Sequence, residues 1–211
     1  MITMRFLRHF AIFLLLLSPC AAEAKEKWTV DSLKVMSDGN DPEAQFELGK
    51  LYMSGKGVDK DINEGLNLFM KSASAGYSKS QHVIGKLYRD GLYLKQSETN
   101  AREWFEKAAK QGYWVAQYDL AALYARYRSN KEAMILAYAW FDVLDKRGHP
   151  KAHKGRDEIK KELEKPDLVK AKRNAETFYE RYVVPFEKKP KKADDEKPSE
   201  DSSADTTKEN E

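Results

Sequence analysis

The chain of 211 residues contains a single cysteine, Cys20, which lies within the first 24 residues. Once those residues are removed, the chain can form neither a disulfide nor a thiolate metal site. Proline is also scarce, with seven in the whole chain, and no later segment approaches the roughly 20 apolar residues of a membrane-spanning helix. The residues that dominate the middle of the chain are Glu, Lys, Ala, Leu and Gln, which are all good helix formers.

The patterns of common catalytic sites are missing as well. No serine sits in a G-x-S-x-G turn, and no G-x-x-x-x-G-K-[ST] phosphate loop occurs. The segment Gly55-Lys56-Gly57 is explained by a turn between helices. His149 and His153 have the i, i+4 spacing that can hold zinc on a helix, but neither an HExxH motif nor a third ligand is nearby. The sequence therefore predicts no catalytic residue, no metal site and no cofactor.

Residues 1–24 have the pattern of an export signal. Arg5 and Arg8 form a positive start, and Phe10 to Leu17 is a short unbroken apolar run. Ala22-Glu23-Ala24 then offers small residues at both positions that determine cleavage. We therefore expect a mature chain that begins at Lys25 and is periplasmic or secreted.

Two alternatives for the same segment stay open. It could act as a membrane anchor, although its apolar run is far shorter than a bilayer span. It could also be a lipoprotein signal with Cys20 lipidated, although Pro19 is a poor residue before that cysteine. We expect cleavage and no stable membrane insertion afterwards.

Charge is nearly balanced over the whole chain. The formal net charge of +3 is too small to indicate nucleic acid binding. Residues 187–211 hold six lysines and nine acidic residues, with no large apolar side chain. Because such a composition buries too little apolar surface to offset the ordering entropy, we expect a disordered charged tail.

Self-comparison at an offset of 36 residues aligns similar residues in six columns. The columns are Gly49, Gly85 and Ala121; Tyr52, Tyr88 and Tyr124; Leu68, Trp104 and Trp140; Phe69, Phe105 and Phe141; Ala44, Ser80, Ala116 and Ala152; and Asn40, Gly76, Gly112 and Gly148. Small residues let a neighbouring helix approach, and aromatic residues fill the space between helices. Asn and Gly tolerate the left-handed conformation in which many helices end. The period therefore predicts stacked helix pairs.

The expected elements follow from these columns and from the prolines. We expect a first helix over 28–38, helix pairs over 42–75, 78–111 and 114–147, a helix over 150–164, a break at Pro166 and a last helix over 167–183. The predicted fold is all-α. It is a right-handed helical-repeat solenoid (α/α superhelix) of about three 36-residue helix pairs, with capping helices at both ends, over residues 25–186.

The columns resemble the Sel-1-like repeat, a relative of the tetratricopeptide repeat whose pattern runs approximately A-x-x-x-L-G-x-x-Y-x-x-G-x-G-V, then D-x-x-x-A-x-x-W-x-x-K-A-A-x-x-G. Along this pattern the first repeat reads Ala44, Leu48, Gly49, Tyr52, Gly55, Gly57, Val58, Asp61, Leu68, Lys71, Ala73 and Gly76. The second reads Gly85, Tyr88, Gly91, Ala101, Trp104, Lys107, Ala108, Ala109 and Gly112, and the third reads Ala116, Leu120, Tyr124, Ala137, Trp140 and Gly148. Two loops depart from the pattern: Tyr93 stands where a second glycine is expected, and residues 127–129 contain no glycine.

The resemblance implies a protein-interaction function, and exported bacterial members are the most similar type. We therefore expect an exported, monomeric scaffold or adaptor of the cell envelope that binds a protein or peptide and catalyses nothing. The alternative is an enzyme that binds or hydrolyses cell wall or β-lactams. An exported branch with paired cysteines is linked to that activity, but this chain lacks those cysteines.

In related superhelices the first helix of each pair lines the concave side. Counting from Gly49, Gly85 and Ala121, the positions six before, three before, one after and four after should face this side. We call these positions the first-helix face. They are Glu43, Phe46, Lys50 and Met53; Lys79, His82, Lys86 and Arg89; and Val115, Tyr118, Ala122 and Ala125. The predicted partner-binding residues are Phe46, Lys50, Lys79, His82, Lys86, Arg89, Val115 and Tyr118. They would suit an acidic segment with one large apolar side chain.

Overall fold

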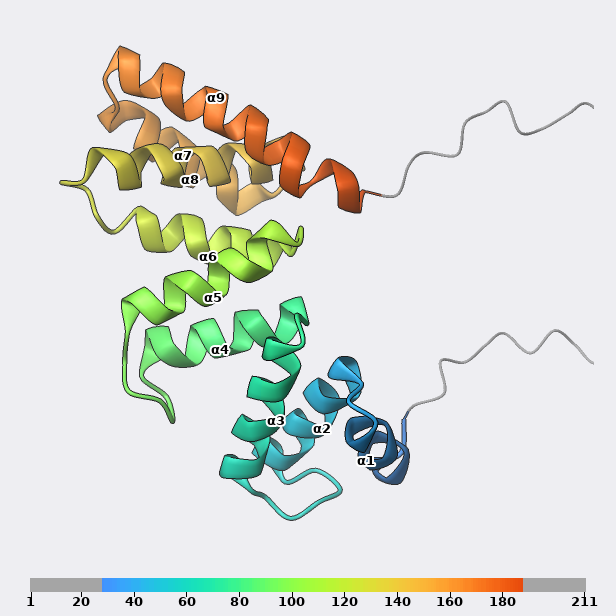
Figure 1. The fold of residues 1–211 in the computed structure, drawn as a ribbon. Helices are drawn as coiled ribbons and strands as arrows, with labels where there is room; N and C mark the ends of the chain where they lie inside the picture. The colour runs from blue at the N-terminus through green and yellow to red at the C-terminus, as the bar shows by residue number, and fades with distance from the viewer. Residues whose placement is uncertain (1–27, 188–211) are drawn as a thin grey trace, which may run out of the picture. The chain divides into compact units, whose positions relative to one another are not determined.

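A computed structural model describes residues 28–187 (Figure 1). All regular elements within this range are helices, so the all-α prediction is confirmed. The export signal expected over residues 1–24 lies outside the described residues. So does the tail expected over 187–211, except for Glu187.

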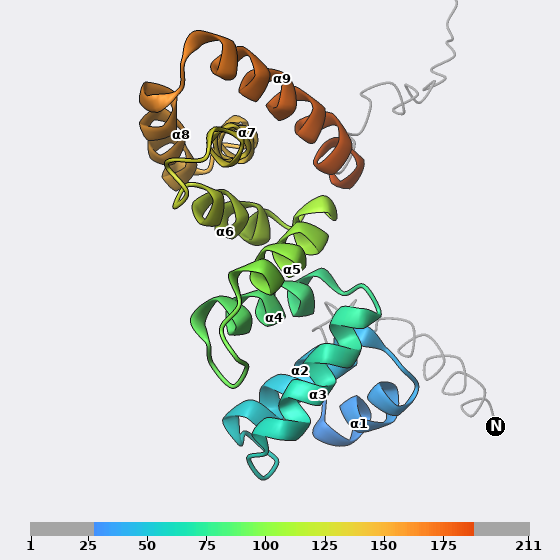
Figure 2. The ribbon, with the colours of Figure 1, turned by 60° about the vertical axis from the view of Figure 1, so that its left-hand side comes forward.

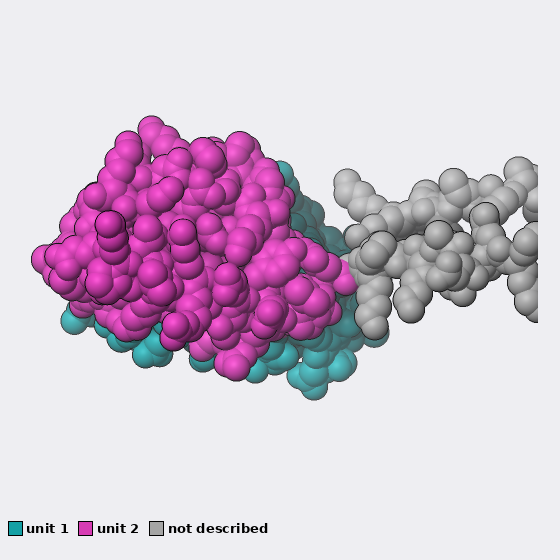
Figure 3. All heavy atoms as spheres, turned by 90° about the horizontal axis from the view of Figure 1, so that it is seen from above, with its two compact units in different colours: residues 1–108 teal, residues 109–211 magenta. Residues whose placement is uncertain are grey.

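The chain divides into two compact units, residues 1–108 and 109–211, which Figure 3 shows in different colours. The described part of unit 1 contains α1 (Val30–Asp38), α2 (Pro42–Ser54), α3 (Ile62–Ser74), α4 (Ser78–Asp90) and most of α5 (Glu98–Lys110). Unit 2 contains α6 (Trp114–Tyr124), α7 (Lys131–Lys146), α8 (Pro150–Glu162), α9 (Lys165–Tyr182) and the 3₁₀ helix η2 (Val184–Phe186). Helix boundaries therefore agree closely with the expected pairs.

The residue that separates successive helix pairs has a left-handed backbone conformation at every predicted position. The backbone φ is 63° at Asn40, 94° at Gly76, 77° at Gly112 and 75° at Gly148. Pro42 lies in the first turn of α2, and Pro150 starts α8 in the same way, because a first-turn proline loses no helical hydrogen bond. The stops and starts predicted from the 36-residue period are therefore confirmed.

The loops inside the helix pairs differ from one repeat to the next. Gly55 and Gly57 are both left-handed, and so are Gly91 and Tyr93 one repeat later, with φ of 62° at Tyr93. In the third repeat the loop holds no left-handed residue, and the side chain of Asn130 caps α7 by accepting from the Ala133 N–H. The loop without glycine is therefore shorter, and α7 has 16 residues where α3 and α5 have 13.

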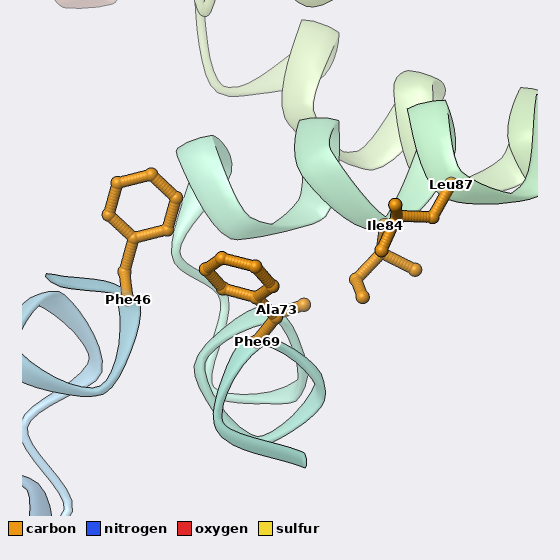
Figure 4. Close-up of a cluster of buried hydrophobic side chains, with 5 residues drawn as sticks. All are labelled: Phe46, Phe69, Ala73, Ile84 and Leu87. Atoms are coloured by element: carbon orange, nitrogen blue, oxygen red, sulfur yellow. The ribbon is translucent and has the colours of Figure 1, made fainter. Parts of the chain in front are cut away.

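The core of unit 1 joins α2, α3 and α4 through apolar side chains. Figure 4 shows the cluster formed by Phe46, Phe69, Ala73, Ile84 and Leu87. The glycine column explains how closely the helices of a pair approach. A Cβ atom at Gly85 would lie 2.6 Å from the ring of Phe105. The small residue predicted at this position is therefore a packing requirement.

The core of unit 2 is built around α7. Figure 2 shows α7 nearly end-on, with α6, α8 and α9 around it, and α7 packs on all three helices. Its side chains are therefore buried on almost every side, from Ala133 to Leu144. Full burial of one large aliphatic or aromatic side chain stabilises the fold by about 1.5–3 kcal/mol. The last helix begins two residues earlier than expected, at Lys165, because Pro166 fits within its first turn.

Candidate functional site

The first-helix face of α2 combines one exposed cation with a buried aromatic ring. Phe46 is only 8% exposed, and its ring centroid lies 5.6 Å from that of Phe69 and 5.5 Å from that of Tyr77. Lys50 is exposed, pairs with Glu47 at 2.5 Å and lies 5.4 Å from the Phe46 centroid. A partner could therefore reach Lys50 directly, whereas Phe46 serves the core of unit 1.

The first-helix face of α4 carries two exposed lysines. Lys79 and Lys86 are exposed, whereas His82 is buried with its ring 5.6 Å from that of Phe105. Arg89 is half-buried and pairs with Asp90 at 2.7 Å, and the hydrogen bond from Arg89 holds the pKa of Asp90 below its usual value. The accessible charge of this row is therefore that of the two lysines, and partner contact by any of its residues stays a prediction.

The first-helix face of α6 carries one aromatic ring, that of Tyr118. Val115 and Tyr118 are both partly buried. The ring of Tyr118 stacks on His149 with centroids 5.6 Å apart, and it meets Phe141 edge-on at 5.8 Å. Contacts with two neighbouring elements fix the position of Tyr118, so this ring forms a rigid surface.

A pocket of about 360 Å³ lies beside Tyr118 within unit 2. It is lined by Tyr118, Ala122, Ala125, Arg126, Arg128, Phe141, Lys151, Lys154, Gly155, Glu158 and Ile159. Three of these residues, Tyr118, Ala122 and Ala125, belong to the first-helix face predicted for the third repeat. The structure therefore brings them together in one concave site.

The cations of this pocket were not predicted by the sequence analysis, although the 36-residue period indicates the positions of two of them. Counting one repeat beyond Ala121 reaches Asp157, and the positions six before, three before and one after it are Lys151, Lys154 and Glu158. These three line the pocket, whereas Lys161, four after Asp157, does not. Helix α8 therefore occupies the position of a first helix in a fourth repeat and extends the first-helix face. In the sequence analysis, residues 150–164 were treated only as a capping helix.

A buried glutamine column was also missed. Gln45, Gln81 and Gln117 follow one another at 36 residues and are at most 5% exposed. Each donates its side-chain amide to the backbone carbonyl eight residues earlier, at 3.4, 3.2 and 3.1 Å respectively. At the fourth position His153 replaces the glutamine, and its Nδ1 lies 3.1 Å from the carboxylate of Asp145.

The two histidines considered as zinc ligands lie in different surroundings. His149 stacks on Tyr118 and meets Trp114 at a tilt, whereas His153 lies beside the carboxylates of Asp145 and Asp157. Residues 28–187 hold no group of three side chains placed to bind a metal ion. Within the same range no helix is both long enough and apolar enough to span a bilayer.

Comparison with known proteins agrees with the repeat architecture. The Sel1 repeat model matches residues 42–77 and 78–113. A solved Sel1 repeat protein from Oxalobacter formigenes is 29% identical, with a TM-score of 0.56, over 61% of this chain and 97% of that one. The chain also resembles c5321, a protective antigen of uropathogenic Escherichia coli with an SLR fold. That likeness has 21% identity and a TM-score of 0.50, and covers 72% of this chain and 41% of that one.

The likeness to c5321 concerns the fold alone, and this chain spans less than half of that protein. The search of curated proteins gave no match. Sel1-repeat proteins are generally scaffolds for protein–protein interaction and typically not enzymes. The two matched segments confirm the predicted resemblance to the Sel-1-like repeat for residues 42–113.

Proposed function

We propose that the chain is an exported protein-interaction scaffold of the bacterial cell envelope, which holds a partner protein on its first-helix face. The pocket beside Tyr118 is the observation that carries this proposal. It is concave, it combines apolar and charged side chains, and it includes first-helix positions of both α6 and α8. Repeat scaffolds use such surfaces to hold extended segments of partner proteins.

Export is supported by the sequence of the first 24 residues. A positive start, a short apolar run and Ala22-Glu23-Ala24 together form the usual substrate of a signal peptidase. Mass spectrometry of the protein purified from cells should therefore find Lys25 as the first residue, and fractionation should find the protein outside the cytoplasm. Cytoplasmic protein that retains residues 1–24 would contradict export.

Partner binding can be tested by capture from an envelope extract with the mature chain, 25–211, as bait. A bait with Lys79→Glu and Lys86→Glu should recover much less partner, because both exposed lysines lie on the first-helix face of α4. The matched control is a bait with Lys71→Glu and Arg102→Glu. These residues are exposed cations on α3 and α5, the second helices of their pairs. If both baits recover equally little partner, the loss reflects net charge. If both recover as much partner as the unchanged bait, the first-helix face of α4 does not bind the partner.

A further inference from the structure

We infer that the pocket beside Tyr118 is a peptide site, and that its ligand is a segment of the partner protein in which carboxylates flank one bulky apolar side chain. The inference rests on the proposed scaffold function and adds a location and a ligand chemistry to it. The pocket has apolar side chains at its base and cationic side chains around it.

The base of the pocket is apolar and firmly packed. The rings of Tyr118 and Phe141 meet edge-on, with Ile159 fully buried beside them. The small side chains of Ala122 and Ala125 leave the volume open. A Cβ atom at Gly155 would lie 2.7 Å from the ring of Phe141, so the glycine lets α8 approach that ring. A volume of about 360 Å³ with this lining suits one large apolar side chain and its flanking backbone.

The charge around the pocket is mainly positive. Arg126, Arg128, Lys151 and Lys154 line it together with a single carboxylate, Glu158. The ammonium group of Lys154 lies 4.0 Å from Glu158, and Arg128 pairs with Glu162 outside the pocket. Lys151 forms no ion pair among residues 28–187. The cations exceed the nearby carboxylates, so acidic side chains of a ligand would be attracted from solution.

The same features argue against other anionic ligands. A free anion would gain nothing from the apolar base, since its binding depends on charge alone. A nucleic acid would need a basic surface that extends well beyond four side chains, and the net charge of the chain is only +3. An acidic peptide with one apolar anchor uses both parts of the pocket.

Fluorescence anisotropy on the mature chain tests this ligand chemistry directly. The probe is a labelled peptide in which glutamates flank one leucine, and the control peptide replaces the glutamates with glutamines. We expect the acidic probe to bind at low ionic strength and to weaken as salt rises, because charges near the surface are screened. The glutamine peptide should bind at least about tenfold more weakly.

A pair of charge-matched variants locates the site. Lys151→Glu with Lys154→Glu should weaken the acidic probe by about tenfold or more. Lys172→Glu with Arg173→Glu changes the net charge of unit 2 equally, at exposed positions of α9 that do not line the pocket, and should leave binding within about twofold of wild type. Circular dichroism should show the same helicity for both.

The outcomes separate this inference from the proposed function. Equal weakening by both variants, or equal binding of both peptides, would overturn the site and its ligand chemistry. If envelope capture succeeds while the probe never binds, the scaffold function stands and the ligand chemistry is wrong. If the probe binds but no partner is captured, the peptide site is supported and the assignment of its ligand to an envelope partner is wrong. Binding only after residues 188–211 are removed would overturn the assignment to a partner and point to the chain's own acidic end.

Discussion

The side-chain amide of Gln117 donates to the backbone carbonyl of Ala109 at 3.1 Å, across the turn between α5 and α6. The same carbonyl also accepts from the N–H of Gly112 at 3.0 Å. The glutamine therefore gives a second hydrogen-bond donor to a carbonyl in the last turn of a helix, where the backbone N–H groups of the helix supply no donor. Gln45 and Gln81 make the same contact, so each of these glutamines bonds its own helix to the C-terminal end of the helix before it.

Replacement of Gln117 by glutamate should destabilise unit 2. The side chain is fully buried, and a carboxylate there would face the Ala109 carbonyl oxygen without a donor. We expect a loss of about 2–4 kcal/mol at neutral pH from the buried charge. Burial would raise the folded-state pKa of the new carboxyl, so the folded state would bind the proton more tightly and the loss should shrink as pH falls. Urea unfolding at several pH values measures this.

Gln117→Met is the control for that experiment. It keeps a similar shape but loses the hydrogen bonds that the amide donates to the carbonyls of Ala109 and Tyr182, at 3.1 and 3.5 Å, so it should cost about 1–2 kcal/mol. The cost should not depend on pH. A glutamate variant that behaves like the methionine variant at every pH would show that water or structural rearrangement reaches the site.

Tyr93→Gly should stabilise unit 1. Tyr93 has φ of 62° and is 58% exposed, and it occupies the position held by Gly57 one repeat earlier. A left-handed tyrosine costs about 1–2 kcal/mol, while glycine adds about 0.4–1 kcal/mol of unfolded-state entropy. The expected net gain in the free energy of unfolding is therefore about 0–1.6 kcal/mol. The neighbouring Leu92→Gly relieves no positive φ and should destabilise; a gain there as well would show that the backbone argument is wrong.

Arg156 holds three carboxylates around the junction of α7 and α8. Its side chain is 19% exposed; it lies 3.8 Å from Asp142 and 2.8 Å from Asp157, and it also pairs with Asp145. Arg156→Gln should cost about 1–3 kcal/mol, because Asp142 and Asp145 would lose their shared cation while partly buried. Lys154→Gln, which removes an 85% exposed cation, should change stability by less than about 0.5 kcal/mol. Equal losses would argue against the burial of this network.

The same arginine predicts part of the acid sensitivity. The hydrogen bond from Arg156 lowers the pKa of Asp157 below its usual value of 3.8. A folded-state pKa below the unfolded value stabilises the protein above pH 3.8, and this contribution is lost as pH falls through the folded-state pKa. The melting temperature of wild type should therefore fall more steeply below about pH 4 than that of Arg156→Gln. Parallel curves would exclude this contribution.

The repeat period predicted the fold well because packing repeats with it. Asn40, Gly76, Gly112 and Gly148 each end a helix in the conformation expected from their residue type. The site was less predictable, since exposure depends on neighbours that the period does not specify. Phe46 and His82 occupy first-helix positions, but Phe69 and Phe105 cover them. The cations from α8 required the register to be carried beyond the third repeat.

Helix α9 covers one side of α7. The Trp140 ring lies 4.6 Å from Phe178, and Ala139 and Val143 pack with Ala175 and Val183. A chain ended after Glu164 would expose these apolar residues of α7, so we expect aggregation or a markedly lower melting temperature. A chain ended after Glu187 keeps α9 and should melt within about 2 °C of the full mature chain. Light scattering and thermal circular dichroism compare the two. If the chain ended after Glu164 stays monomeric and equally stable, α9 contributes nothing to the fold and the packing of Trp140 against Phe178 is dispensable.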